Sequence, residues 1–370
     1  MRAIFISLLA AAVALTVAGC TLRESAEPPS VQTGSTSSPL SLEGSCKSPD
    51  APPADVARKP GYRQFDVSVT NSLGWPVSGL TQHDFVLHAG SQTFPVTYFR
   101  EHKDDEPVAI ALVVDTSGSM AWKLPIARQS LGGFVKNLNR CDEVSVFAFN
   151  RQVVLLQPFT ADHQMAAERM EFNAHGPNAI YDATNTALLS LEGADYPNRK
   201  LVLVADGLDD SSATSEREVV ARARKDGIPI YAIGIGDPNA KNGIAVGPLH
   251  ITGTSYWPVG APQEVGPPDS GIPTSFVAGF RSPGATDRVD AKSLEDLSAA
   301  AGGRSFIVPS RGEEEGRSFE TAVFAVADNI AKGYTIGAVL PDDVTPSAVK
   351  MTVVKRLDLD VRAHPIAASH

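Results

Sequence analysis

The chain has 370 residues, of which 43% are hydrophobic and 20% charged, and its formal net charge is -10. This is an ordinary globular composition, and the length suggests about two domains beyond any signal segment. The acidic balance, together with the lack of a prominent Lys/Arg cluster, argues against nucleic acid as a partner.

The N-terminal segment is typical of a secretory signal. Residues 1–19 contain one early Arg, then an apolar stretch, then small residues before Cys20. The ending "VAGC" is similar to the bacterial lipobox, and this similarity implies that Cys20 is lipidated and anchors the chain in the cell envelope. A plain signal peptide or an uncleaved anchor stays open as an alternative. Thr21 favours the outer membrane, or the cell surface, over the inner membrane.

Residues 20–60 are rich in Ser, Pro and Ala and poor in large apolar side chains, which predicts a tether without a core. The chain has three Cys, so lipidation of Cys20 leaves Cys46 and Cys141 as a pair in an oxidising compartment. We predict a disulfide between them that clamps the tether onto the end of the first large helix. Two free thiols remain the alternative.

Both ends of the remaining chain show the pattern of short β-strands. In 61–104, Phe65, Val67 and Val69 alternate with polar residues, and "DFVLHAG" and "FPVTYF" predict two further strands. In 334–364, "GYTIGAVLP" and "AVKMTVV" predict strands, and an alternating segment follows. Neither end is long enough to be stable alone. We therefore predict one small β-sandwich built from both termini, with a separate β unit at each end as the alternative.

The middle of the chain, 105–333, predicts a doubly wound α/β domain with a mostly parallel sheet. Four nearly continuous apolar runs indicate strands buried on both faces, at 108–114, 144–149, 200–205 and 228–235. Helical patterns lie between them, including one whose apolar face comprises Leu131, Phe134, Val135 and Leu138. Alternation of strand and helix is typical of this fold class, here inserted in or flanked by the predicted sandwich.

An acid and two hydroxyls end the first of these runs. The stretch "DTSGSM" places Asp115 at the strand end and Ser117 and Ser119 just beyond it, and Asp206 ends a later run, "LVLVADG". Ligands of open α/β sheets bind beyond the C-terminal strand ends, so we expect these side chains to converge at an open edge. Carboxylate and hydroxyl oxygens favour Mg²⁺, with Mn²⁺ or Ca²⁺ as alternatives, over zinc.

The arrangement resembles the von Willebrand factor type A (VWA) domain with its metal-ion-dependent adhesion site. Asp115, Ser117 and Ser119 match the Asp-x-Ser-x-Ser motif of the family, and Asp206 matches its later Asp. The resemblance covers about 105–335, and with the flanking β segments it extends to a bacterial subgroup of secreted proteins. It implies a divalent cation whose coordination is completed by an Asp or Glu of a protein partner.

One position departs from the family pattern. In "HGPNAIYDA", Asn178 stands where the metal-binding Thr belongs, and its carbonyl oxygen can still ligate a cation or hold a water. Thr184 is a weaker substitute, and Asp182 is expected in a supporting role or as an orienting residue of the loop. Asp209 and Asp210 are interpreted as a solvated turn rather than as ligands.

A long segment, 237–288, separates the last of the four apolar runs from the next helical pattern. It has about fifty Pro/Gly-rich residues and leaves the sheet at the edge that carries the acids. Loops of this length are usually functional or disordered. We predict a partner-reading loop or lid, with disorder or a small hairpin as alternatives.

These features together predict a non-enzymatic, envelope-tethered adhesion or scaffold factor. One alternative is a degenerate domain that binds partners without metal. A metal-dependent phosphohydrolase is a weaker one, because the Asp-x-Asp motif of such enzymes has Ser117 at its third position here. The sequence also lacks a Gly-x-Ser-x-Gly elbow and a Walker loop.

Overall fold

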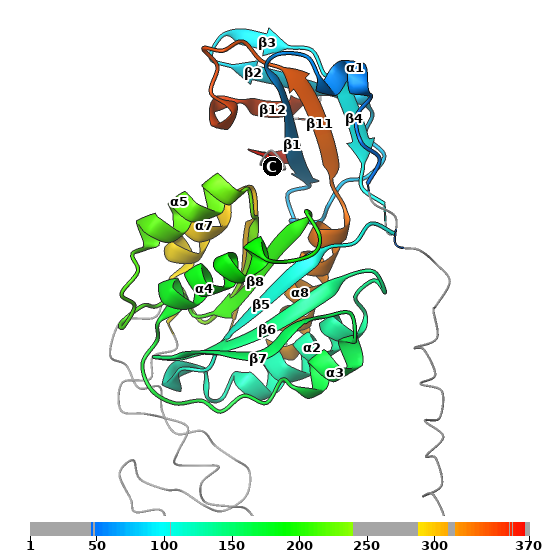
Figure 1. Cartoon of the computed structure of the whole chain (residues 1–370). Coiled ribbons are helices and arrows are strands. Elements are labelled where there is room, and N and C mark those ends of the chain that lie inside the picture. Colours follow the sequence, from blue (N-terminus) through cyan, green and yellow to red (C-terminus); the bar gives the residue numbers. More distant parts are fainter. Residues whose placement is uncertain are drawn as a thin grey trace, which may run out of the picture. The chain divides into compact units, whose positions relative to one another are not determined.

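Figure 1 shows the computed structural model of the chain, which describes residues 46, 49–103, 105–239, 288–309, 315–354, 356 and 358–366. The predicted signal segment with Cys20, and nearly all of the predicted insertion, lie outside these residues. In the part that the structure describes, no helix is both long enough and apolar enough to span a membrane.

A six-stranded sheet forms the centre of the α/β part. Its strand order is β10-β9-β8-β5-β6-β7, and all neighbours are parallel except β7, which runs antiparallel to β6. The bounds are β5 (Ala109–Asp115), β6 (Glu143–Phe149), β7 (Val153–Thr160), β8 (Arg199–Ala205), β9 (Ile230–Ile235) and β10 (Arg304–Val308). The predicted fold class is confirmed, while the edge strands β7 and β10 were not predicted; both are only partly buried.

Helices cover both faces of this sheet (Figure 1). One face packs against α2 (Leu124–Lys136), α3 (His163–Glu168) and α8 (Glu315–Ala331), and the other against α4 (Ile180–Glu192), α5 (Glu216–Asp226) and α7 (Ala291–Ala299). Successive residues of β5 alternate between the two cores: Leu112 joins the first and Val113 the second. Burial on both faces is why the central strands read as unbroken apolar runs.

Two smaller antiparallel sheets contain strands from both ends of the described chain. One has the order β13-β1-β11-β4 and the other β12-β2-β3. The bounds are β1 (Tyr62–Thr70), β2 (Phe85–Ala89), β3 (Gln92–Phe94), β4 (Tyr98–Glu101), β11 (Tyr334–Val339), β12 (Lys350–Val353) and β13 (Asp360–Pro365). They enclose one apolar core that includes Phe65, Leu87 and Tyr334. Strands from both ends of the described chain therefore complete the same two sheets and the same core.

One expectation about these segments needs correction. The stretch "FPVTYF" is not one strand, because β3 ends at Phe94 and β4 begins at Tyr98 in a different sheet; Pro95 between them has no amide hydrogen to pair. The predicted tether also contains ordered structure. A short helix, α1 (Ala54–Ala57), lies within it, and the Tyr98 hydroxyl donates to the carbonyl oxygen of Asp50 at 2.6 Å. The remaining helical turns are η1 (Gln82–Asp84), η2 (Gly118–Met120) and η3 (Pro346–Ala348).

Candidate metal centre

Two carboxylates lie side by side at the C-terminal edge of the central sheet. Asp115 is the last residue of β5, and Asp206 directly follows β8, the strand paired with β5. Both residues are fully buried, with 0% exposure. The expectation of an open edge is therefore wrong: the loop before α4 covers the acids, and Gly118 donates its amide to the carbonyl oxygen of Gly176 at 3.0 Å.

The turn after β5 brings two hydroxyls to the same place. The Ser117 amide donates to Asp115 Oδ1 at 2.7 Å, which bends the chain back over the acid. The Ser117 and Ser119 Oγ atoms lie 3.0 Å apart, and Ser119 Oγ donates to Asp206 Oδ2 at 2.5 Å. Four of the five predicted ligands thus form one connected group.

Asn178, the fifth, lies between the two carboxylates. Its Nδ2 donates to Asp115 Oδ2 at 2.7 Å and to Asp206 Oδ1 at 3.2 Å. Its Oδ1 is buried and has no hydrogen-bond partner in the described structure. A buried amide oxygen without a partner is uncommon in native proteins and calls for an explanation.

The two acids that follow Asp206 hold this asparagine in place. Asp210 Oδ1 accepts from the Asn178 amide at 2.7 Å, and Asp209 Oδ1 accepts from the Ile180 amide at 3.1 Å. The amides of Asp210 and Ser211 in turn donate to the Asn178 carbonyl oxygen, each at 3.0 Å. Asp210 is exposed, and no hydrogen bond joins either acid to the carboxylate pair in the described structure; beyond the predicted turn, their side chains join the two loops.

The other two candidates in this loop do not reach the carboxylate pair. Asp182 accepts from the amides of Ala213 and Thr214 at 2.9 and 2.8 Å, so it orients the loop after β8. The hydroxyl of Thr184 donates to the carbonyl oxygen of Ile180 at 2.7 Å, within its own helix. Thr184 is therefore not positioned as a substitute ligand.

Burial and the nearby charge of Asp206 raise the pKa of Asp115 above its ordinary value, while the Ser117 amide and Lys123 act in the opposite direction.

Lys123 is a residue of this site that the sequence analysis did not identify. It is fully buried, and its Nζ donates to the carbonyl oxygen of Ile235 at 2.7 Å. The available signal was a charged residue inside the apolar stretch that follows the motif. This lysine offsets part of the negative charge of the acid pair.

The residues present fit a hard divalent cation. The group offers two carboxylates, two hydroxyls and one amide oxygen, and this all-oxygen chemistry suits Mg²⁺. The Asn178 oxygen is an acceptor in need of a partner. Within the described residues, no three His, Cys, Asp or Glu side chains gather in a way that could hold a metal. A cation would therefore depend on the hydroxyl and amide oxygens as well as on the acids.

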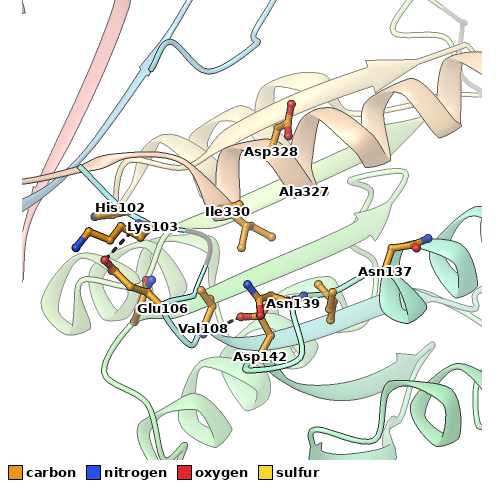
Figure 2. A pocket seen from close by; sticks show the side chains of 13 residues that line it. His102, Lys103, Glu106, Val108, Asn137, Asn139, Asp142, Ala327, Asp328 and Ile330 are labelled. Carbon is orange, nitrogen blue, oxygen red and sulfur yellow. Dashed lines mark hydrogen bonds between the residues drawn. The ribbon is translucent and has the colours of Figure 1, made fainter. Parts of the chain in front are cut away.

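A cavity of about 340 Å³ lies at the opposite edge of the sheet, and two acids that line it, Asp142 and Glu106, have structural roles (Figure 2). Its acid Asp142 precedes β6, and burial raises the pKa of this residue to about 6. The two Asp142 oxygens accept from the amides of Val108 and Asn139, both at 3.0 Å. Glu106 accepts from Arg100 and from the Lys103 amide. These acids are occupied in holding the loops that lead into β5 and β6.

Comparison with known proteins agrees with this architecture. The family model of the von Willebrand factor type A domain matches residues 109–246. Human matrilin-4 is 31% identical over 145 residues, which are 35% of this chain and 23% of that protein. The chain spans less than half the length of the curated relatives it matches.

Two solved structures are also similar. The conserved hypothetical protein BatB from Bacteroides thetaiotaomicron is 18% identical with a TM-score of 0.41, covering 60% of this chain and 98% of that one. Proximal thread matrix protein 1 from the mussel byssus, with a zinc-occupied MIDAS motif, is 14% identical with a TM-score of 0.43, covering 64% and 49%. The residues that match the von Willebrand factor type A family model thus include Asp115, Asn178 and Asp206 of the carboxylate site.

Proposed function

We propose that the chain is an envelope-anchored lipoprotein whose VWA domain captures a protein partner through a divalent cation, in an adhesion or scaffold role and without catalysis. Asp115, Ser117, Ser119 and Asp206 would hold the cation together with Asn178. The cation would supply a Lewis-acidic position for an Asp or Glu of the partner. Mg²⁺ is favoured, and the partner is a protein rather than nucleic acid.

The observation that carries this proposal is the convergence of two buried carboxylates with two hydroxyls. Like charges that share a buried site repel each other, and a dication at their oxygens relieves that repulsion. Lys123 reduces the negative charge of the pair, as its effect on Asp115 indicates. With two carboxylates and one ammonium, the site would keep a net positive charge once a dication is bound. An acidic side chain of a partner is the ligand that matches it.

The disulfide joins the start of the described chain to the α/β part. Cys46 and Cys141 are bonded, and Cys141 lies just before β6, at the edge of the sheet opposite to Asp115.

The test is calorimetric Mg²⁺ titration of the mature chain and of Asp206→Asn, with Asp296→Asn as the control. Asp296 is a surface acid of α7 that pairs with Lys292. We expect binding by wild type and control and none by Asp206→Asn. Capture of a partner from envelope extract should likewise require Mg²⁺ and fail with Asp206→Asn. A wild-type protein that binds neither Mg²⁺ nor Mn²⁺ at millimolar concentration would refute metal-dependent capture.

One observation favours a second candidate, a domain that binds its partner without metal. The Asn178 amide already donates to both carboxylates, so the acid pair has a neutral partner inside the protein. Partner binding that persists unchanged in EDTA would support this candidate over the first.

A further inference from the structure

Asn178 has two chemically different ends, and only one of them is used in the described structure. The Nδ2 end donates to Asp115 and Asp206, while the Oδ1 end is buried without a partner. The residue is only 4% exposed, so water has little access to compensate the free oxygen. In this orientation the Asn178 amide hydrogens bind the two carboxylates, and the Asn178 Oδ1 atom is left without a donor.

This orientation is incompatible with a cation at the same two carboxylates. An N–H group that points toward a cation is repelled by it, whereas an amide oxygen is attracted. Rotation by half a turn about the last side-chain bond exchanges the two ends, since the amide group has almost the same shape either way. The same rotation would turn the oxygen that now lacks a partner toward the carboxylate pair.

We propose that Asn178 is a cation-responsive toggle: its amide group bridges Asp115 and Asp206 in the metal-free protein and turns its oxygen toward the cation when one binds. This inference rests on the proposed metal-dependent function and specifies how this chain differs from one with Thr at that position. A Thr hydroxyl has a single donor hydrogen and cannot bridge both acids. The toggle makes the metal-free state stable and weakens cation affinity.

The backbone around Asn178 is fixed, so the change is confined to its side chain. The Asn178 amide and carbonyl oxygen are both bonded to the loop after β8, through Asp210 and Ser211. Cation binding should therefore alter the side-chain amide signals of Asn178 without rearranging the loops.

Selective ¹⁵N-Asn labelling of the mature chain provides the direct test, because each Asn side chain gives its own pair of NH₂ signals. The Asn178 pair is assigned by its loss in Asn178→Thr. Asn329 is a matched internal control: it is also buried, donates two hydrogen bonds and has an Oδ1 without a partner, but it belongs to α8. Mg²⁺ should shift the Asn178 pair and leave the Asn329 pair unchanged.

The substitution Asn178→Thr tests the effect of the toggle on metal-free stability and on Mg²⁺ affinity. Without its bridge to the acids, the variant should melt at a lower temperature than wild type in EDTA. It should bind Mg²⁺ roughly tenfold more tightly, since the cation no longer displaces hydrogen bonds to charged acceptors. Asn178→Ala should share the loss of metal-free stability without gaining affinity, because it offers the cation no oxygen.

The outcomes separate the toggle from the proposed function. If wild type binds Mg²⁺ and Asn178→Thr binds no more tightly, or if the Asn178 signals do not move, the toggle is refuted and the metal-dependent function stands. If only Asn178→Thr binds Mg²⁺, the Asn178 amide blocks the site permanently, and both the toggle and the metal-dependent function are refuted for the natural chain. If neither protein binds the ion, both are refuted as well.

Discussion

Lys200 and Asp66 form an ion pair that joins the central sheet to the β-sandwich, with side chains only 4% and 15% exposed. Lys200 lies near the start of β8 and Asp66 in the middle of β1. Two imidazoles complete the cluster: His102 Nε2 lies 3.9 Å from Asp66 Oδ1, and His364 Nε2 lies 3.7 Å from Asp66 Oδ2. Burial alone would raise the pKa of Asp66, but Lys200, His364 and His102 together hold it below its ordinary value.

This cluster predicts a loss of stability in mild acid. Burial lowers the pKa of both His102 and His364 to about 4, against the attraction of Asp66. An unfolded His takes up its proton near pH 6.5, so these residues contribute full stability above that pH and lose it as the pH falls toward 4. We expect unfolding by urea to require about 2 kcal/mol less free energy per histidine at pH 5 than at pH 7. Asp66 adds a further loss only below about pH 4.

The control for this prediction is an exposed histidine. His364→Gln should reduce the difference between pH 7 and pH 5, whereas His83→Gln, on the surface in η1, should leave it as in wild type. Equal pH dependence in all three proteins would show that the buried imidazoles do not determine it.

The second prediction is that Asp206→Asn has opposite effects on stability and on cation binding. Asn keeps an oxygen that can accept from the amides of Asn178 and Leu208, as Asp206 Oδ1 does, while one of two facing buried charges disappears. In EDTA the variant should be as stable as wild type or about 1 kcal/mol more stable. Added Mg²⁺ should raise the melting temperature of wild type only. A variant that unfolds in EDTA would instead assign Asp206 a purely structural role.

The third prediction concerns the Cys46–Cys141 bond, which spans a sequence separation of 95 residues. A cross-link that closes so long a loop limits the unfolded chain, so Cys46→Ser with Cys141→Ser should lower the free energy of unfolding by about 2–5 kcal/mol. Urea unfolding of the double variant and of reduced wild type should give the same loss. Unchanged stability in both would contradict a stabilising role of the bond.

The fourth prediction compares two glycines. A Cβ on Gly303 would lie 2.0 Å from the carbonyl oxygen of Ile230, so Gly303→Ala should disturb the pairing of β10 with β9 and cost about 3 kcal/mol. Gly132, inside α2, has open space around its Cβ position. Gly132→Ala should therefore stabilise the protein by up to about 1 kcal/mol. Thermal unfolding of both variants checks the opposite signs.

The sequence alone determined the parts of this protein that depend on local pattern. Apolar runs such as 108–114 can be satisfied only by burial on both faces, and this predicted the parallel sheet before any contact was known. Asp115 and Asp206 end two such runs, so their position at one edge followed from the fold class. The edge strand β7 was not predicted: it exposes Val154 and Leu155 and buries Gln157, which reverses the pattern that the sequence reading relies on.

Only the tertiary structure decided what those residues do to one another. Three contacts join segments that lie far apart in the chain: the Asn178 amide binds Asp115, Asp210 anchors the loop of Asn178, and Lys200 pairs with Asp66. The complete burial of Asp115 likewise depends on distant segments. Whether a polar side chain is a ligand, an anchor or part of a solvated turn depends on which distant donor meets it and how much water remains. Local sequence fixes neither quantity, because both arise when the sheets and loops pack together.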